Sequence, residues 1–412
     1  MDGISPFLRS QYSRDFRAAD ASFRHGRVEA TTKARQTHWN RWVSYCQPLR
    51  VDPHLQGVPY STRVQLLTGF AARMRWGGYG SGQKVKSDTV GTALSSVGKE
   101  ISLAIEVNPV KLAGSERMVP RLAQTLDGWR KEDGPVMKKL PVKADVPELL
   151  VKLSLMDGSP FVQAVADLAT IAFYYLLRIG EYTVKGQRNE SKQTRQFKLK
   201  DVTIFKRDKR GRLRQLPRTA PAQHIMTADC ATLKLDNQKN GWHGVCINHE
   251  WNGDDTFDAV RALGRRYLHI RDNSNNNWST YLSAVFTDRT KTDVRDRDIR
   301  AAIKKAAAML DYPASRGIPI ERIDTHSLRI GGANALSLAG YSDRQIQKMG
   351  RWRGETFKEY VREQLSNFSE GMSKSMRKCF GFVNVEGGVF HDVTSTVTAM
   401  EYNMEVSTAS AA

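Results

Sequence analysis

Residues 324–363 carry an imidazole, a guanidinium and a phenol that could act together on a charged substrate, with an indole among them. His326 and Arg329 lie three residues apart at the head of an apolar-periodic segment, and Trp352 and Tyr360 follow it. A guanidinium binds anionic oxygens through a planar fork, an imidazole can hold or move a proton near neutral pH, and a phenol can act as a nucleophile. The spacing predicts that successive short helices direct these groups into one pocket.

Two candidates lie earlier in the chain. Arg178 ends an apolar segment over 161–177 and precedes Glu181 by three residues, a spacing that a simple ion pair across one helical turn would also explain. Lys239 lies in the turn-forming stretch 236–241, where a solvated lysine is the ordinary case. Neither residue indicates a function by itself.

Together, these residues could cleave a phosphodiester without a metal. Two arginines would stabilise the charge on the non-bridging oxygens, a tyrosine would attack phosphorus, and a lysine on a hairpin tip would protonate the leaving oxygen. The nine histidines include no HxxxH or HExxH pattern, so we predict neither a metal site nor a cofactor.

The charge of the chain favours a polyanionic partner. The net charge is +20, with 63 Lys and Arg against 43 Asp and Glu. Residues 1–145 carry 23 basic against 13 acidic residues, and residues 146–412 carry 40 against 30, so each part contributes +10. This spread predicts a nucleic acid gripped from two sides.

The cysteines and the hydropathy of the chain indicate the cellular compartment in which we expect the protein. Cys46, Cys230, Cys246 and Cys379 show no CxxC pair, and the N-terminus has no signal-peptide pattern. They predict free thiols in a reducing, intracellular compartment, the nucleus if the host is eukaryotic and otherwise the cytoplasm or nucleoid. No apolar run approaches about 18 residues, so we expect no membrane partner.

Five segments make up the predicted organisation. They are a disordered basic arm (1–27), a helical DNA-binding bundle (28–132), a linker (133–147), a larger domain (148–384) and an acidic tail (385–412). Helical periodicity in the bundle begins near residue 30 and recurs over 60–76, 87–105 and 119–131, with tryptophans on the apolar faces. In the larger domain we predict strands at 197–205, 231–235 and 244–248, and helices at 161–177, 255–270 and 296–310.

Several basic residues are predicted to contact the nucleic acid. They are Lys33, Arg35 and Arg41 on the first helix of the bundle and Lys138, Lys139 and Lys143 in the linker. An extended linker would let its lysines lie along a phosphate backbone.

Five motifs in this order resemble the tyrosine recombinase (phage-integrase) family. They are Arg178-Ile-Gly-Glu181, Gln-Lys239-Asn-Gly, His326-Ser-Leu-Arg329, Gly350-Arg-Trp352 and Phe-Lys-Glu-Tyr360. Each is weak alone, and their order makes the signal specific. The Gly-Arg-Trp motif is most similar to that of recombinases from eukaryotic mobile elements (crypton-like or DIRS-like). The resemblance covers about residues 30–380.

The resemblance implies a mostly α fold with a small antiparallel sheet. A core-binding (SAM-like) bundle and a mixed α/β catalytic domain would form a C-shaped clamp on DNA. Tyr360 would give a 3′-phosphotyrosine, Arg178, His326 and Arg329 would hold the phosphate, Trp352 would hydrogen-bond or buttress it, Lys239 would protonate the 5′ oxygen, and Glu181 would support the pocket. The implied partner is double-stranded DNA with a specific site, bound by a dimer, and by a tetramer at synapsis.

Two assignments and two functions stay open. Trp352 precedes Tyr360 by eight residues where the family more often has nine, so by count alone Arg351 would take its place; Lys234 could replace Lys239. The alternative functions are a type IB topoisomerase and a non-catalytic DNA-binding protein derived from a recombinase. For the latter, 336–349 could pass for a helix-turn-helix with a capping box at 342–345.

Overall fold

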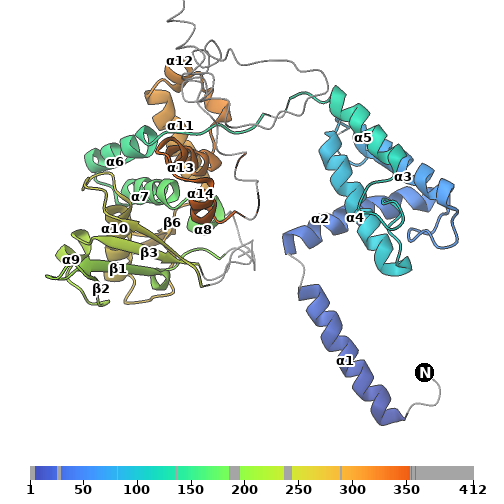
Figure 1. The fold of residues 1–412 in the computed structure, drawn as a ribbon, viewed down its shortest axis with the longest axis horizontal. Coiled ribbons are helices and arrows are strands. Elements are labelled where there is room, and N and C mark those ends of the chain that lie inside the picture. Colours follow the sequence, from blue (N-terminus) through green and yellow to red (C-terminus); the bar gives the residue numbers. More distant parts are fainter. Residues whose placement is uncertain are drawn as a thin grey trace, which may run out of the picture. The chain divides into compact units, whose positions relative to one another are not determined.

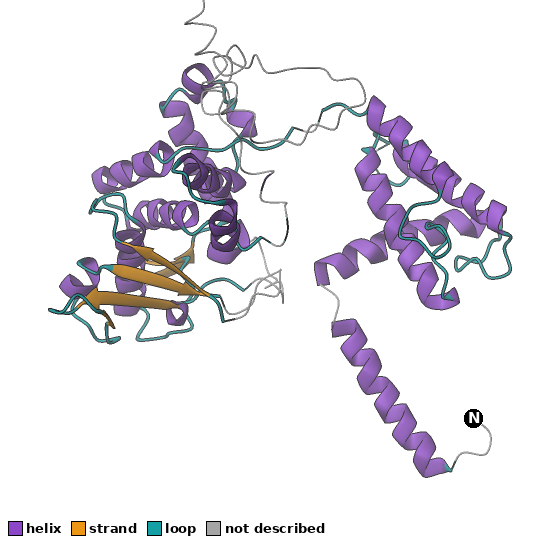
Figure 2. Cartoon of the chain, viewed as in Figure 1, coloured by secondary structure: helices purple, strands orange, loops and turns teal. Residues whose placement is uncertain are grey.

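The computed structural model describes residues 5–25, 29–80, 82–135, 137–184, 195–235, 244–287 and 290–352, together with 354 and 358. These residues are mostly helical, with one four-stranded and one two-stranded antiparallel sheet (Figures 1 and 2). The predicted fold class is confirmed. In the described part of the chain, no helix is long and apolar enough to cross a bilayer.

The N-terminal arm is a helix, α1 (Pro6–His25), and our prediction of disorder there was wrong. The large apolar side chains that the structure describes on α1 are exposed, Phe7 by 70% and Phe16 by 61%. Tyr12 and Phe16 stack one turn apart, with ring centroids separated by 6.2 Å. Contacts at this i, i+4 spacing support a helix locally, although they are too sparse to suggest a packed face.

Four helices pack around one apolar core in the N-terminal bundle. They are α2 (Glu29–Cys46), α3 (Tyr60–Arg75), α4 (Ser87–Ile105) and α5 (Pro120–Glu132), with a 3-10 turn, η1 (Gln47–Leu49), after α2. Trp42 is fully buried, and its indole Nε1 donates to the Pro53 carbonyl at 2.8 Å. Trp39 and Trp129 pack against the same core. These three tryptophans therefore belong to the core, as their place on the apolar faces predicted, whereas Trp76 after α3 is 60% exposed.

The second body, residues 140–352, contains the remaining elements. Its helices are α6 (Asp145–Asp157), α7 (Pro160–Tyr174), α8 (Ile179–Tyr182), α9 (Ala222–Met226), α10 (Ala259–Asn273), α11 (Asp296–Met309), α12 (Tyr312–Arg316), α13 (His326–Leu338) and α14 (Asp343–Gly350), with 3-10 turns η2 (Leu199–Asp201) and η3 (Ile320–Arg322). Its strands are β1 (Val202–Arg207), β2 (Leu213–Gln215), β3 (Cys230–Lys234), β4 (Cys246–Glu250), β5 (Ala284–Thr287) and β6 (Thr290–Asp293).

Helix α7 is the centre of this body. Residues 164–173 are all buried, and the helix packs against α6, α10, α11 and α13. A helix that is apolar on every side needs neighbours all round, which is why the sequence predicts it as the buried element. Its one buried acid, Asp167, is paired with Arg265 at 2.7 Å. Burial raises the pKa of Asp167, and the Arg265 charge opposes that effect.

The main sheet has the strand order β2-β1-β3-β4, all antiparallel. The β3–β4 pair, with Lys234 opposite Cys246, matches the predicted hairpin. One predicted boundary was wrong. The first strand begins at Val202, because residues 199–201 form η2, and the basic segment after β1 contains a further strand, β2. The β5–β6 hairpin was not predicted; it is short and polar, so its alternation is weak.

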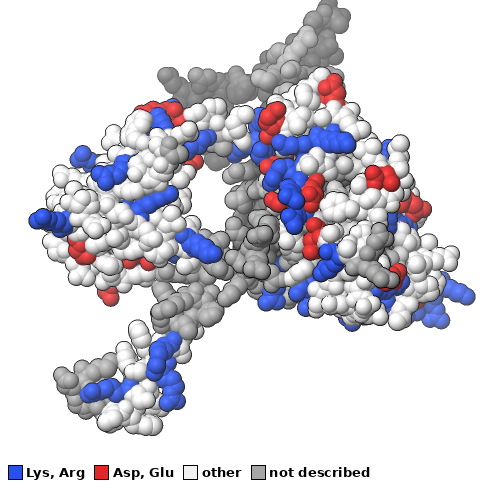
Figure 3. Space-filling model, turned by 180° about the vertical axis from the view of Figure 1, so that it is seen from behind, with Lys and Arg blue, Asp and Glu red and all other residues white. Residues whose placement is uncertain are grey.

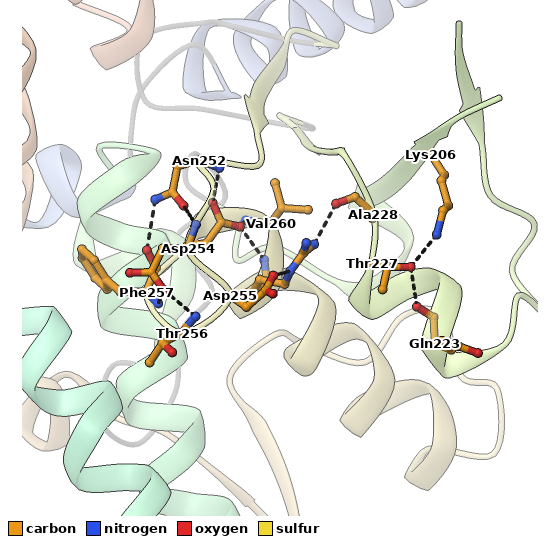
Figure 4. A network of polar contacts seen from close by, with 12 residues as sticks. Lys206, Gln223, Thr227, Ala228, Asn252, Asp254, Asp255, Thr256, Phe257 and Val260 are labelled. Carbon is orange, nitrogen blue, oxygen red and sulfur yellow. Dashed lines mark hydrogen bonds and ion pairs between the residues drawn. The ribbon is translucent and has the colours of Figure 1, made fainter. Parts of the chain in front are cut away.

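A polar network fixes the start of α10 (Figure 4), and one of its residues also contacts the end of α7. The Asp258 carboxylate caps α10 by accepting from the Val260 and Arg261 amides at 2.7 and 2.8 Å, and it also accepts the Asn252 amide at 3.0 Å. The Asn252 side chain donates to the Tyr174 hydroxyl at 3.1 Å. The network therefore anchors the C-terminal turn of α7, from which the chain continues to Arg178.

The last residues of the predicted linker pack on α13. The amides of Leu140 and Val142 donate to the carbonyls of Arg322 and Ser327 at 3.0 and 3.2 Å, and Val142 is fully buried. A Cβ at Gly331 would lie 1.8 Å from the Val142 carbonyl oxygen, and one at Gly332 would lie 2.2 Å from the Phe173 carbonyl oxygen. These glycines let α13 approach both the linker and α7, which brings the start of α13 to the end of α7.

Candidate active site

The pocket begins with a left-handed turn after α7. Leu176 has φ 49°, and the Leu177 amide closes the turn on the Ala172 carbonyl at 3.0 Å. Glycine usually occupies such a position, because a side chain there costs on the order of 1 kcal/mol. The turn ends α7 and leaves Arg178 as the residue before α8. The fully buried Leu176 carries the carbonyl that two arginines share.

Glu181 is the acid at the back of the pocket and is fully buried. Its carboxylate accepts the Arg178 amide at 2.9 Å and the Arg178 guanidinium at 3.3 Å. It also lies 3.1 Å from Arg351 Nη2. The simple Arg178–Glu181 ion pair is therefore present. The same carboxylate also caps α8 and holds a second guanidinium, so it fixes the geometry of the whole corner.

Arg329 is held from two directions. Its side chain comes from the first turn of α13 and is 1% exposed. Nη1 donates to the Leu176 carbonyl, and Nη2 donates to the Gly350 carbonyl at 2.6 Å. The Trp352 ring covers the guanidinium, with its centroid 4.4 Å from Cζ. A guanidinium fixed in this way has lost its rotamer freedom before any ligand binds.

Arg351 and Trp352 occupy different places, although either could fill the same motif position by sequence. Arg351 closes α14 in the left-handed conformation (φ 57°), and its buried guanidinium reaches the Leu176 carbonyl at 2.7 Å and Glu181. Trp352 lies over Arg329. A Cβ at Gly350 would lie 1.6 Å from the indole, so that position requires glycine. The Arg351 side chain thus supports the pocket from behind, and Trp352 forms a wall.

His326 is the first residue of α13 and is half-buried. Burial lowers its pKa, and the charges of Arg329 and Arg178 lower it further. The imidazole is therefore neutral at pH 7, with one donor and one acceptor nitrogen. His326 and Arg329 lie one turn apart on α13, so the imidazole and that guanidinium occupy neighbouring positions on the helix surface.

Asp324 serves the start of α13, and its charge only partly opposes the lowering of the His326 pKa. Its carboxylate pairs with Arg300 at 2.9 Å and accepts the Thr325 amide at 2.7 Å. Glu181 is thus the acid that contacts Arg178 and Arg351, and Arg329 adds a further positive charge. Such a corner suits an anion with several oxygens.

Two proposed reactive residues, Lys239 and Tyr360, lie outside the described residues, as does the predicted tail. The strands that flank residues 236–243 are in place, and Lys234 is an exposed residue at the end of β3. The described part of this corner therefore contains Arg178, Glu181, His326, Arg329 and Trp352. The proposed nucleophile and the proposed general acid are tested by experiment below.

The predicted nucleic-acid contacts lie elsewhere. Lys33, Arg35 and Arg41 are on α2, where Lys33 is exposed and the two arginines are partly exposed. In the linker, Lys138 and Lys143 are exposed, whereas the Lys139 ammonium donates to the Glu321 carbonyl at 3.0 Å. The predicted capping box of α14 is present: the Gln345 side-chain oxygen accepts from the Ser342 amide and hydroxyl at 3.0 and 2.7 Å.

Sequence reasoning missed two parts of the corner, namely the Leu176 carbonyl and the role of Arg351. Nothing in the sequence marks Leu176 as left-handed. For Arg351 the signal is its place in the sequence, between Gly350 and Trp352. If the Trp352 ring covers Arg329, the neighbouring Arg351 side chain can point to the opposite side, toward Glu181.

No protein-family model and no curated protein matches this sequence. Among solved structures, the chain is similar to the Tn1549 transposon integrase in complex with transposon right-end DNA, at 13% identity and a TM-score of 0.43, covering 87% of this chain and 97% of that one. It is also similar to XerA recombinase (15%, 0.33, 83% and 98%) and to a lambda integrase dimer bound to a COC′ core site (13%, 0.37, 79% and 88%).

Proposed function

We propose that this chain is a site-specific DNA recombinase that cleaves and rejoins strands through a covalent 3′-phosphotyrosine formed by Tyr360. One observation carries the proposal. Arg329 and Arg351 share the Leu176 carbonyl, Arg351 and Arg178 share Glu181, and Trp352 covers Arg329, while His326 lies one turn before Arg329 on α13. Two guanidinium groups, an imidazole and an indole are the parts that a phosphodiester in an in-line displacement requires.

The arginines would hold the scissile phosphate. Arg329 is fixed by two carbonyls and Trp352, and Arg178 is fixed by Glu181. As the attack proceeds, negative charge grows on the non-bridging oxygens, and donors already in position stabilise that charge without reorganising. Arg351 contributes through Glu181 and Leu176, as a positioning residue.

The reaction balances without a nucleotide. The Tyr360 Oη attacks phosphorus, the bond from phosphorus to the 5′ oxygen breaks, and its electron pair leaves with that oxygen. Lys239 supplies the proton that makes a free 5′-hydroxyl, and neutral His326 can accept the proton of the phenol. The phosphodiester bond energy is kept in the phosphotyrosine, so a 5′-hydroxyl from a second duplex can reverse the step and complete an exchange.

The partner is duplex DNA that carries a specific recombination site. Exchange between two sites needs a dimer on each and a tetramer at synapsis, and the proposed biological setting is integration or excision of a mobile element. The likeness to crypton-like or DIRS-like recombinases rests on Gly350-Arg351-Trp352 and remains a prediction. Lys33, Arg35, Arg41, Lys138 and Lys143 are proposed DNA contacts; Lys139 would have to exchange its bond to Glu321 for a phosphate.

A nicked suicide substrate tests the proposal. Cleavage close to a nick releases a short fragment that diffuses away, so a covalent intermediate accumulates. The wild-type protein, given a duplex bearing its site, should form an adduct that survives SDS and carries the label of the strand 5′ to the break. If the cognate duplex is bound but no adduct accumulates, the chain is a DNA-binding protein and the proposed chemistry is wrong.

The general-acid role of Lys239 gives a separate prediction. Lys239→Ala should slow cleavage by about 10²-fold or more, because the 5′ oxygen would leave unprotonated. A substrate with a bridging sulfur at that position has a better leaving group and should recover most of the rate. Lys234→Ala is the matched control, and recovery seen there instead would move the role to Lys234.

A pH prediction follows from His326. Its pKa lies below the ordinary value of 6.5, so the imidazole stays neutral down to that lower pKa and becomes charged below it. In kcat/KM, which reports the free enzyme, the acid limb of cleavage should therefore lie below pH 6.5. His326→Gln should be slower and should lack this limb. An identical limb in His326→Gln would assign the titration to another group.

A further inference from the structure

A second cationic surface lies away from the candidate active site. Residues 206–218 read Lys-Arg-Asp-Lys-Arg-Gly-Arg-Leu-Arg-Gln-Leu-Pro-Arg, with seven basic side chains and one acid. They form the end of β1, the turn, β2 and the segment that follows; this stretch is called the basic hairpin below. The proposed cleavage reaction uses none of these residues.

Hydrogen bonds hold the basic hairpin in a defined conformation. The Asp208 carboxylate accepts the amides of Arg210 and Arg212 at 2.9 and 3.0 Å, and Gly211 takes the left-handed conformation (φ 75°). Backbone hydrogen bonding, from Arg212 above all, lowers the pKa of Asp208. Thr227, the residue directly after α9, accepts a hydrogen bond from the Lys206 ammonium (Figure 4). The one acid is thus part of the turn, and the hairpin is anchored to the body.

The positive charge of the basic hairpin is only partly balanced. Arg212 and Arg214 share Asp208 at 3.2 Å, and Arg207 pairs with Glu250 at 3.3 Å. Lys209 and Arg210 are exposed at the turn, and no described acidic side chain pairs with either of them. Figure 3 shows Lys and Arg side chains at the outer end of this body, where β2 lies.

The strand register places basic side chains next to one another, and a bound anion would relieve their repulsion. Lys206 lies directly opposite Arg214, and cross-strand neighbours of like charge destabilise a sheet by a few tenths of a kcal/mol up to about 1 kcal/mol. Basic residues on an edge strand can simply protect the edge from pairing with other chains. A few charges suffice for that purpose, whereas this segment extends its basic residues past the strand to Arg218.

The basic hairpin and the candidate active site lie at different ends of the sheet. β1 pairs through Val202 with Leu233, near the end of β3, and runs from there to Arg207, where the turn begins. Six residues of strand span about 20 Å. In Figure 1, β2 lies at the end of the sheet away from α8 and α14. A phosphate bound at the hairpin would therefore be a different one from the scissile phosphate.

We infer that the basic hairpin is a second, sequence-independent contact for the phosphate backbone of duplex DNA, outside the segment that enters the active site. The inference rests on the proposed action on DNA. The ligand it takes is a run of backbone phosphates, bound by Lys209 and Arg210 at the turn and by the arginines of β2 beside them.

The test measures the salt dependence of binding to a long duplex lacking any recombination site, by fluorescence anisotropy. Each phosphate contact contributes about 0.9 to the slope of log K against log salt. Lys209→Gln/Arg210→Gln should therefore lower the slope by roughly 2, which amounts to roughly 12-fold less loss of affinity between 50 and 200 mM salt. Lys209→Arg/Arg210→Lys should keep the wild-type slope.

A matched variant controls for net charge. Lys304→Gln/Lys305→Gln removes the same charge from α11. If it lowers the slope as much as the hairpin variant does, the effect is one of overall charge and the inference is overturned. A hairpin slope equal to wild type, or a decrease seen with duplex RNA alone, also overturns it.

Failure of this inference can be distinguished from failure of the proposed function, because adduct formation on a suicide substrate is measured with the same proteins. If the hairpin variant has the wild-type slope while the wild-type protein forms the adduct, only the proposed hairpin contact is wrong. If the hairpin variant has the lower slope while the wild-type protein forms no adduct, only the proposed recombinase chemistry is wrong.

Discussion

Tyr360→Phe should abolish the covalent protein–DNA adduct and recombination while leaving DNA binding close to wild type. Without the phenolic oxygen no bond to phosphorus can form, so the cleavage rate should fall by at least about 10⁴-fold, as it does when other covalent nucleophiles are removed. The measurement is accumulation of the SDS-resistant species on the suicide substrate, with affinity followed separately by anisotropy.

Tyr341→Phe is the matched control, because Tyr341 is a 50% exposed residue in the connection between α13 and α14. It should form the adduct at the wild-type rate. An adduct formed by Tyr360→Phe and lost in Tyr341→Phe would assign the nucleophile to Tyr341, and the proposed pocket would have to be redrawn.

Arg329→Lys should reduce the cleavage rate by about 10²–10³-fold, although it keeps the charge. One ammonium group cannot replace the planar fork that spans the Leu176 and Gly350 carbonyls beneath Trp352. A buried acceptor left without its donor costs about 1–3 kcal/mol, so the melting temperature should fall as well. Single-turnover cleavage and thermal unfolding measure the two effects.

Arg344→Lys makes the same substitution at an exposed position of α14 and should change neither quantity. To separate stability from chemistry, cleavage is compared at a temperature at which both variants are fully folded. If Arg329→Lys cleaves within about threefold of wild type there, the fixed guanidinium does not matter to the transition state and the proposed role of Arg329 is wrong.

The sequence allowed the prediction of the helices and of the residues that meet, because both depend on local patterns. The apolar periodicity of residues 87–105 and 296–310 corresponds closely to α4 and α11. His326 and Arg329, three residues apart at the start of one helix, necessarily lie on neighbouring positions of its surface. The Gly-Arg-Trp motif also marks Trp352, whose ring lies over Arg329.

The remaining features depend on contacts between distant segments. The left-handed Leu176 is stable because its carbonyl receives donors from Arg329 and Arg351, more than 150 residues later in the chain. Strand β2 has three exposed residues and no alternation of its own, so it exists only through its pairing with β1. Neither feature has a local signal that a single sequence could show.

The most direct test of the central claim is to map the attachment site on the trapped adduct. Trypsin should release residues 359–362, Glu-Tyr-Val-Arg, since Lys358 precedes them and Arg362 ends them. Mass spectrometry after nuclease treatment should find the nucleotide on Tyr360 in this peptide, linked through the 3′-phosphate. A nucleotide linked through its 5′-phosphate, or one on a peptide that contains another tyrosine, would contradict the account.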